Sequence, residues 1–438
     1  MLPKVLIIGE TFRQDTGGGI TLSNLFRAWP KEKLGVITLS NINDFEICNR
    51  YYSIGDNEKR LAWPFQLFIE IRKSGEISNI ENSERSKKHK RNIIVSSIKN
   101  YFVKLFGKLS HFIGIHHSLN TIRVSENLLH WVNLYKPDLI YFQPNSLSLV
   151  LFVKQIYQKT NIPIAIHIVD DYIHTKNKMG LFFSHYEKVV KFEYNEMVKI
   201  SDVQFSICEE MSMEYFTRFN KKFIPIHNPI IKENWLKSDY SNYTLNDSCH
   251  IAYTGRIGIA NIEAIIFMVE IVDKLYKEGI LIYFDIYSID EDVKLIRTIK
   301  TKRGSSFKHF VCHDKLPETL LKYDILYLPL STNKRSLRYT RLSMPTKVAE
   351  YMISGRPIIV FSAPSTALFR YATEKEWAFV TDNKEKLIRG LRNLIYSKEL
   401  REKFGKTAQK VALENHDIGK VEMSFISTIK GCLEEKQI

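Results

Sequence analysis

Three segments of the sequence bring together residue types that can bind an anion. The first is Gly17-Gly18-Gly19, which follows the apolar run Lys4–Gly9 and precedes a helical pattern that starts near Thr21. Glycines let the backbone approach a ligand closely, and the N–H groups at the start of a helix attract anions. The spacing differs from that of the dinucleotide-binding fingerprint. A flexible strand-to-helix loop is the alternative interpretation of this motif.

The second segment is Thr254-Gly255-Arg256, at the end of the strand-like run His250–Thr254. Ligands of parallel sheets bind at the carboxyl ends of strands, near the point where the strand order reverses. An arginine at such a place can hold a phosphate group with two parallel hydrogen bonds. Considered alone, Arg256 is better explained as a surface residue in a turn.

The third and most specific segment is SMPTKVAEYM (343–352), which an SGRP turn follows. Pro345 favours the start of a helix, and Gly355 favours its end. The start of this helix and Lys347 could then face an anion. The Glu350 carboxylate, one turn later, could accept two hydrogen bonds from a ribose diol. The alternative is an ordinary capped amphipathic helix with a solvated glutamate.

The elements that must position these segments alternate along the chain. Short runs rich in Ile, Val and Tyr, without polar alternation, are typical of strands buried on both faces. The expected strands are Lys4–Gly9, Gly35–Leu39, Asp138–Phe142, Pro163–Ile168, Val203–Ile207, Phe223–His227, His250–Thr254, Leu281–Tyr287, Asp324–Pro329 and Pro357–Phe361. The segments between them have helical spacing, as in Ile262–Lys277 and Lys384–Leu394. This alternation predicts an α/β protein with parallel, doubly wound sheets. A polar break near 229–248 divides it into two Rossmann-like domains.

The charge balance indicates which partners to expect. The 438 residues include 63 Lys+Arg against 48 Asp+Glu, a net charge of +15, which favours anionic partners. No nucleic-acid-binding signature accompanies this excess, so we expect no nucleic acid. The five cysteines lie far apart, which argues against a disulfide framework or a zinc site. No apolar stretch approaches the ~18 residues of a transmembrane helix, and we expect a cytoplasmic protein.

Two basic segments account for much of the positive charge. Between Ser83 and Lys108, apolar positions recur on one helical face, and Lys99, Lys104 and Lys108 accompany them. This basic amphipathic pattern is compatible with an anionic membrane surface. The alternative is a solvated insertion whose apolar face packs onto its domain. The second basic segment, 334–347, has no acidic residue and points to a charged donor or a phosphate ligand. For Lys334 and Arg335 a solvated loop is the simpler interpretation.

Taken together, these segments resemble a glycosyltransferase of the GT-B fold and are most similar to glycosyltransferase family 4. The resemblance rests on the N-terminal strand with its glycine loop, TGR at 254–256, DILYLPL at 324–330, and S-x-P-x-K-x-x-E-Y at 343–351 followed by SGRP. Their order and spacing cover nearly the whole chain. The resemblance implies two Rossmann-like domains that face each other across a cleft, and a retaining, metal-independent reaction.

The resemblance also implies a role for each domain. An acceptor domain is expected at 1–232, with a basic insertion near 80–115, and a nucleotide-sugar donor domain at 233–415. A last helix, 416–438, is expected to cross back to the first domain. The donor would be a nucleotide-diphosphate sugar, with no other cofactor. The acceptor would be a glycan or a polyprenyl-pyrophosphate-linked molecule, which would place the basic segment at the inner face of the cell membrane.

The family's binding residues transfer to matching positions of this sequence. Arg256 matches the arginine that holds the donor diphosphate, and Glu350 matches the second acid of the family's E-x7-E motif, which binds ribose. The other expected diphosphate-binding residues are Lys347, Thr346, Gly18 and Gly19. Two positions depart from the pattern: Leu342 stands where the first acid belongs, and Asn261 stands where a second phosphate-binding lysine is usual.

The segment after the run Pro163–Ile168 carries the candidate catalytic residues. Family members often have a histidine at this strand end, facing the donor sugar, and Asp170 occupies that position here. Asp170 could bind a sugar hydroxyl or stabilise an oxocarbenium-like transition state. His167 lies three residues earlier and could instead be a core histidine. For Asp171, capping of a following helix is the simpler interpretation.

The leading functional hypothesis is therefore a hexosyltransferase-type enzyme that acts in cell-surface polysaccharide synthesis. It would move a sugar from a nucleotide-diphosphate sugar to a glycan or lipid-linked acceptor, with retention. The missing acid at Leu342 motivates one alternative, a GT-B scaffold that binds a nucleotide or glycan without catalysis. A second alternative is a sugar-nucleotide epimerase of the same fold.

Overall fold

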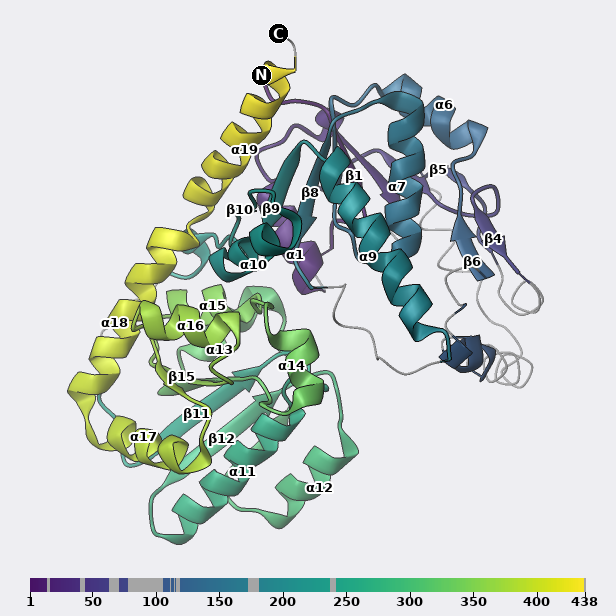
Figure 1. The fold of residues 1–438 in the computed structure, drawn as a ribbon. Helices are drawn as coiled ribbons and strands as arrows, with labels where there is room; N and C mark the ends of the chain where they lie inside the picture. The colour runs from purple at the N-terminus through teal and green to yellow at the C-terminus, as the bar shows by residue number, and fades with distance from the viewer. Residues whose placement is uncertain are drawn as a thin grey trace. The chain divides into compact units, whose positions relative to one another are not determined.

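The computed structural model describes residues 1–13, 16–39, 44–62, 71–77, 105–110, 112–113, 115, 119–171, 181–236 and 242–436. The chain forms two compact units (Figure 1). The N-terminal unit consists of Met1–Ile226 and Glu422–Ile438, and the C-terminal unit consists of His227–Val421. Each unit is described by itself below.

The N-terminal unit is built on one large sheet. In spatial order its strands are β10 (Ile224–Pro225), β9 (Val203–Ser206), β8 (Ile164–Ile168), β7 (Leu139–Phe142), β1 (Val5–Ile8), β2 (Leu34–Thr38), β3 (Tyr51–Ser53) and β5 (Gly75–Ile77). Neighbouring strands are parallel except for the antiparallel pair β3–β5. The order along the chain reverses between β1 and β7. A separate antiparallel pair joins β4 (Lys59–Leu61) to β6 (Asn120–Ile122).

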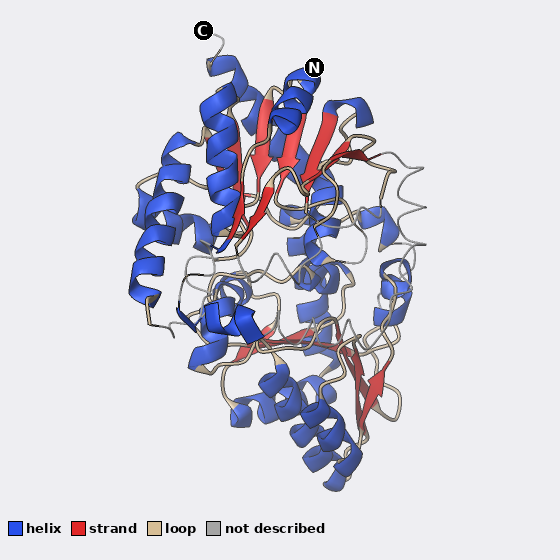
Figure 2. Cartoon of the chain, turned by 90° about the vertical axis from the view of Figure 1, so that its right-hand side faces the viewer, coloured by secondary structure: helices blue, strands red, loops and turns tan. Residues whose placement is uncertain are grey.

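Helices connect the strands of this sheet and lie against it (Figure 2). They are α1 (Gly17–Leu25), the 3-10 helix η1 (Lys31–Lys33), α6 (Glu126–Tyr135), α7 (Leu147–Thr160), α9 (Phe183–Ile200) and α10 (Glu209–Phe219). Ser125 and Ser146 cap α6 and α7 by accepting backbone N–H groups. The last helix, α19 (Ile418–Glu435), brings Phe425 against Phe26 and Tyr141. Residues from Glu422 onward therefore complete the core of this unit.

The C-terminal unit has a sheet with the order β13 (Ser305–Lys308), β12 (Ile282–Tyr287), β11 (Cys249–Thr254), β14 (Ile325–Pro329), β15 (Ile358–Phe361) and β16 (Phe379–Thr381). Every neighbouring pair is parallel. The order along the chain reverses between β11 and β14, so these two strands flank the switch point. Ligands of open α/β sheets bind at the carboxyl ends of such strands.

The helices of the C-terminal unit surround this sheet. They are η2 (Lys232–Asn234), α11 (Ile262–Lys277), α12 (Val293–Thr301), η3 (His313–Lys315), α13 (Leu316–Leu320), α14 (Lys334–Thr340), α15 (Lys347–Ile353), α16 (Ala367–Glu374), α17 (Lys384–Tyr396) and α18 (Lys398–Asn415). One face of α11 packs into a core of buried side chains from β11, β12 and β14. The fully buried strands β14 and β15 explain the unbroken apolar runs of the sequence.

The predicted strands all overlap strands of the structure, and the parallel α/β architecture is confirmed. The sequence did not indicate β3, β4, β5, β6, β13 or β16. These strands are short, and β4, β13 and β16 are only partly buried, so they lack a long apolar run. The predicted helix Ile262–Lys277 coincides with α11 because one face of it is apolar at helical spacing.

Candidate active site

A sharp turn at Gly255 begins the candidate site of the C-terminal unit. Gly255 follows β11 with φ of 125°, a conformation that favours glycine. Its N–H donates to the Tyr287 carbonyl at 2.9 Å, which ties the turn to the end of β12. A Cβ at this position would lie 2.5 Å from Lys347 Nζ. The backbone conformation therefore requires glycine here, and any Cβ would also displace the Lys347 ammonium group.

A pocket of about 370 Å³ lies at the switch point of the sheet. It is lined by the turn after β11, the end of β14 and the start of α15, namely Arg256, Ile257, Gly258, Ile259, Ala260, Asn261, Leu328, Pro329, Leu330, Pro345 and Lys347. The pocket thus combines two cationic side chains, Arg256 and Lys347, at the carboxyl ends of parallel strands. Its position is the one that the sequence predicts for an anionic ligand.

Lys347 enters this pocket beside the ring of Tyr253. Its Nζ donates to the Tyr253 hydroxyl at 2.9 Å and lies 4.2 Å from the centre of the ring. Burial lowers the pKa of Lys347 to about 8, and the nearby Glu350 opposes this shift. A cation that has lost part of its hydration binds an anion strongly, since the anion replaces interactions with water.

Arg256 is the more exposed of the two cations. Its Nε donates to Asp290 Oδ2 at 2.6 Å, and 75% of its side chain is exposed. The same carboxylate oxygen accepts the backbone N–H of Ile257 at 2.9 Å. Asp290 therefore fixes the turn by accepting a hydrogen bond from Arg256 Nε. Among the described residues, no side chain or carbonyl accepts a hydrogen bond from the two terminal amino groups of Arg256. These groups can grip a phosphate in the bidentate manner.

Asn261 stabilises the same turn rather than supplying a charge. Its side-chain amide donates to the Tyr253 hydroxyl at 2.7 Å and to the Arg256 carbonyl at 2.9 Å, while its oxygen accepts from Gly258 at 3.0 Å. At the position where a second lysine is usual, the buried Asn261 thus holds the backbone at Arg256. It also holds the Tyr253 hydroxyl, to which Lys347 donates.

Helix α15 presents Lys347 and Glu350 together. These two are the only residues of the helix that are partly exposed, and their spacing of three places them on one face. The helix begins at Lys347 rather than at Pro345, and Thr346 makes no side-chain capping hydrogen bond. It ends at Ile353, and Gly355 follows with φ of 69°, as the sequence predicts.

His313 holds the Glu350 carboxylate, a contact that the sequence did not indicate. The two side chains approach with His313 Nε2 3.1 Å from Glu350 Oε1. The hydrogen bond to Glu350 raises the pKa of His313 above its ordinary value. His313 opens η3, which follows β13 in the chain, so it reaches Glu350 only through the folded structure.

Leu342, at the position of the missing acid, is a core residue. It is 2% exposed, and Met344 beside it is 5% exposed. The loop between α14 and α15 therefore turns apolar side chains inward at this point. In this structure a ligand has no access to the side chain of residue 342.

In the N-terminal unit, the three glycines belong to a helix and not to a loop. Helix α1 starts at Gly17, and the Thr16 hydroxyl caps it by accepting the Gly19 N–H at 3.1 Å. A Cβ on Gly18 would lie 2.7 Å from a Glu10 carboxylate oxygen, and one on Gly19 would lie 2.7 Å from Arg13. The expected helix start near Thr21 is therefore wrong. Gly19 leaves no room for a Cβ because Arg13 and the Thr16 hydroxyl pack against this first turn, whereas a Cβ on Gly18 would displace only the end of the Glu10 side chain.

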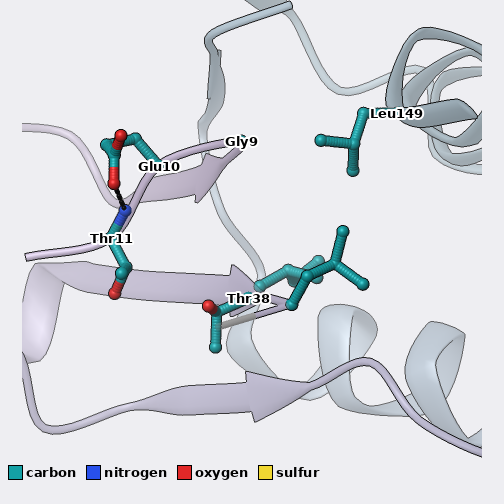
Figure 3. A pocket seen from close by; sticks show the side chains of 7 residues that line it. Gly9, Glu10, Thr11, Thr38 and Leu149 are labelled. Carbon is teal, nitrogen blue, oxygen red and sulfur yellow. Dashed lines mark hydrogen bonds between the residues drawn. The ribbon is translucent and has the colours of Figure 1, made fainter. Parts of the chain in front are cut away.

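A second, smaller pocket lies at the carboxyl ends of β1 and β2 (Figure 3). It measures about 40 Å³ and is lined by Gly9, Glu10, Thr11, Ile37, Thr38, Leu39 and Leu149. The Glu10 carboxylate accepts the Thr11 N–H at 3.0 Å at the edge of this pocket. The volume is enough for a solvent molecule but not for a sugar ring.

His167 is fully buried in β8. Its Nδ1 lies 2.6 Å from the Tyr141 hydroxyl, and its ring contacts those of Tyr141 and Phe205 edge-on. Burial lowers the pKa of His167 to about 3, so the ring is neutral at ordinary pH. These contacts suit packing, the alternative interpretation, rather than the catalytic role that the resemblance suggested.

The two aspartates after β8 lie in different surroundings. Asp170 is exposed. Asp171 is 5% exposed and forms a two-point ion pair with Arg218, at 2.8 and 3.0 Å, and accepts the Tyr215 hydroxyl at 2.9 Å. Asp171 therefore anchors α10, whereas the sequence suggested a helix cap. Asp170 remains the candidate carboxylate of this strand end.

The basic amphipathic segment is described only in part. Lys99 and Lys104 lie outside the described residues, whereas Lys108 is exposed within the helical stretch 105–110. On the same stretch, Leu105 is 47% and Leu109 is 49% exposed. In the parts of the chain that the structure describes, no helix is both long and apolar enough to cross a membrane. Those parts also contain no cluster of three acidic, histidine or cysteine side chains that could hold a metal ion.

Comparison with known proteins identifies the fold. Residues 248–397 match the family model described as Glycosyl transferases group 1. The whole chain is similar to HepE of Anabaena, solved in complex with UDP and glucose, with a TM-score of 0.61, 11% identity and coverage of 98% of this chain and 99% of that chain. It is also similar to sucrose-phosphate synthase from Thermosynechococcus elongatus, with a TM-score of 0.63, 10% identity and coverage of 98% and 99%.

A putative UDP-N-acetylglucosamine 2-epimerase from Listeria monocytogenes is similar as well, with a TM-score of 0.54, 13% identity and coverage of 99% of this chain and 98% of that chain. A search of curated proteins finds no match. The matched family segment contains the pocket with Arg256 and Lys347, together with Glu350 and His313. The chain therefore has the GT-B fold, and its C-terminal unit carries the match to glycosyl transferases group 1.

Proposed function

We infer that this protein is a retaining glycosyltransferase that takes its sugar from a nucleotide-diphosphate donor. The observation that carries this inference is the pocket at the switch point of the C-terminal sheet, where Arg256 and Lys347 meet and which Glu350 follows one turn along α15. Two cations suit a diphosphate, and a carboxylate one helical turn away suits a ribose diol. The match to glycosyl transferases group 1 over the same residues supports this assignment.

In the proposed reaction, the bond between the sugar C1 and the diphosphate oxygen breaks, and a bond from C1 to an acceptor oxygen forms. Negative charge develops on the leaving diphosphate, which takes up the proton that the acceptor hydroxyl loses. Arg256 and Lys347 stabilise that charge without a metal ion. Preorganised cations are effective here because they need no rearrangement as the charge develops.

The identity of the donor base is suggested by solved proteins of the same fold. HepE is solved with UDP-glucose, at a TM-score of 0.61 and 11% identity. We propose a UDP-sugar as the first donor to test, with GDP-, ADP- and CMP-sugars beside it. A donor that stabilises the folded protein raises its unfolding temperature.

The acceptor is proposed to be a glycan or a lipid-linked glycan in cell-surface polysaccharide synthesis, as in glycosyltransferase family 4. Support comes from the net charge of +15 and from the exposed apolar and basic side chains of the stretch 105–110. A cytoplasmic enzyme at the inner face of the membrane would meet such an acceptor. Binding to vesicles with and without anionic lipid tests this part.

The site assignment is tested by Arg256→Ala and Glu350→Ala, with Arg297→Ala and Glu318→Ala as exposed controls from the same unit. We expect each site variant to lower kcat/KM for the preferred donor by about 100-fold. The controls should keep the activity, and all four variants should keep the unfolding temperature. Full activity in both site variants would contradict the assignment.

An epimerase is the second candidate, because the C-terminal unit would bind the same donor. The similarity to a putative UDP-N-acetylglucosamine 2-epimerase favours testing it. Incubation with UDP-N-acetylglucosamine alone distinguishes the two functions, since an epimerase needs no acceptor. A catalytically silent scaffold would bind the donor and convert it in neither assay.

A further inference from the structure

Among the residues that the structure describes, His313 is the one whose side chain contacts the expected ribose-binding carboxylate, that of Glu350. Its Nε2 lies 3.1 Å from Glu350 Oε1. Because a carboxylate can only accept hydrogen bonds, Nε2 must carry the proton in this contact. The side chain of His313 is 37% exposed and that of Glu350 is 15% exposed. The pair is therefore open to a ligand on one side.

The contact leaves Glu350 able to bind a ribose. An ionised carboxylate offers about four acceptor positions on its two oxygens. His313 occupies one of them on Oε1, and a ribose diol donates two hydrogen bonds. The three donors can therefore share one carboxylate, with the imidazole fixing its rotamer before the ribose arrives.

The position of His313 also follows from the sheet. β13, β12 and β11 are neighbours in the sheet, and η3 follows β13 after a short connection. The pocket lies at the end of β11, and Glu350 lies one turn along α15 from the pocket residue Lys347. A nucleotide whose diphosphate occupies the pocket and whose ribose reaches Glu350 would then extend toward η3.

We propose that His313 is a positioning residue of the donor site, which orients Glu350 for the ribose of the donor nucleotide. This proposal rests on the proposed function, because it assumes that a nucleotide sugar is the ligand. It adds a residue that the sequence motifs do not contain. Holding the carboxylate in one rotamer lowers the entropy that is lost when the ribose binds.

The charges around His313 give the contact a pH dependence. Glu350 on α15 faces the imidazole, Asp314 follows it on η3, and Lys347 lies one turn before Glu350. Glu350 raises the pKa of His313, so the imidazole stays protonated to a higher pH than usual. Above that pH the neutral imidazole still donates a hydrogen bond to the Glu350 carboxylate, but a positive charge near the diphosphate is lost. Donor affinity should therefore fall as the pH rises through this range.

The test compares His313→Ala and His313→Gln with the wild-type chain, and uses His309→Ala as a control. His309 is exposed in the connection between β13 and η3. UDP-glucose is the probe, because its diphosphate is bonded at both ends and keeps a constant charge between pH 6 and 9. Binding is measured by calorimetry at several pH values, and kcat and KM are measured with the donor that the panel identifies.

We expect His313→Ala to raise Kd and KM about 10-fold and to leave kcat within about 2-fold, since the lost interaction concerns binding. His313→Gln should recover part of the affinity, because its amide can still donate to Glu350. Both variants should lose the fall of affinity that the wild type shows as the pH rises through the raised pKa of His313. His309→Ala should match the wild type throughout.

The outcomes separate this proposal from the proposed function. If the wild-type chain binds UDP-glucose and both His313 variants keep its affinity and pH profile, the positioning role is wrong and the donor site stands. A glutamine variant as weak as the alanine variant, with a wild-type pH profile in both, also overturns it. If the wild type binds no nucleotide sugar of the panel, the proposed function fails and the proposal fails with it.

Discussion

Asp290 uses one carboxylate oxygen to hold both the side chain and the backbone of the turn after β11. Its Oδ2 accepts Arg256 Nε at 2.6 Å and the N–H of Ile257 at 2.9 Å. Asp290 follows β12, which pairs in parallel with β11, so the two turns meet at the same edge of the sheet. The sheet register therefore determines where the guanidinium of Arg256 points.

The first prediction concerns this anchor. Asp290→Asn keeps an acceptor oxygen but removes the charge that draws Arg256 to it. We expect KM for the donor to rise about 5-fold. This factor corresponds to roughly 1 kcal/mol of donor-binding free energy, because a charge-assisted hydrogen bond to an exposed arginine contributes about that much. Steady-state kinetics at low and high salt measure this change in KM. Asp292→Asn is the control, because Asp292 caps the start of α12 and does not contact Arg256. An unchanged KM would mean that Arg256 orients itself without Asp290.

The second prediction concerns Lys347. The pKa of this lysine is about 8 in the folded protein, below its ordinary value of 10.5. Between these two values the unfolded chain binds more protons than the folded chain, so stability should rise as pH rises from 8 to 10.5. Below pH 8 the buried, charged lysine lowers the free energy of unfolding. Lys347→Met should therefore increase that free energy by about 1–3 kcal/mol at pH 7.

The same variant should bind the donor poorly, since it removes one of the two cations of the pocket. Urea unfolding at pH 7 and pH 10, with donor binding at pH 7, tests both statements. The stability gain should be largest at pH 7 and should shrink at pH 10. A methionine variant that is less stable than the wild type at pH 7 would show that Lys347 contributes to the fold.

The sequence predicted those parts of the structure whose signals are local. Fully buried strands such as β14 and β15 appear as unbroken apolar runs, and α11 appears as an apolar stripe at helical spacing. Arg256, Lys347 and Glu350 were found because each belongs to a short motif, Arg256 just after a strand and the other two in the first turn of a helix. The start of α1 was misread because glycine disfavours helices, whereas the close packing of Arg13 requires Gly19 in its first turn.

The residues that the sequence missed act over long separations. Asp290 lies 34 residues from Arg256, and His313 lies 37 residues from Glu350. No spacing rule connects such pairs, because the pleating of the sheet and the turn geometry bring them together. Tyr253 was part of a predicted strand, but its contact with Lys347 crosses 94 residues. Only the fold shows which polar side chains support the motif residues.

The third prediction uses the buried His167. Its pKa is about 3 in the folded protein and returns to about 6.5 on unfolding. Between these values the unfolded chain binds the additional proton, so His167 lowers stability as the pH falls from 6.5 toward 3. The loss amounts to about 1.4 kcal/mol per pH unit at most.

His167→Leu should therefore be less sensitive to acid than the wild type. The measurement is urea unfolding at pH 7 and pH 5, where the wild type should lose about 2 kcal/mol more than the variant. The variant also loses the hydrogen bond to Tyr141, so the comparison rests on the difference between the two pH values. A variant of normal stability whose turnover is abolished would restore His167 as a catalytic candidate.

The fourth prediction concerns the position of the missing acid. Leu342 is 2% exposed, so Leu342→Glu would place a carboxylate among apolar side chains. Such a group either stays ionised at a high cost or takes up a proton with a raised pKa. We expect a loss of about 3–5 kcal/mol in the free energy of unfolding at pH 7, and no gain in turnover.

Leu342→Met and Leu342→Ala provide the comparison for this prediction. The methionine variant keeps the volume and should lose less than about 1.5 kcal/mol, whereas the alanine variant leaves a cavity and should lose about 2–5 kcal/mol. Both should keep the donor KM if residue 342 contributes only to packing. A stable glutamate variant with a lower donor KM would show that the loop between α14 and α15 can turn this side chain toward the donor.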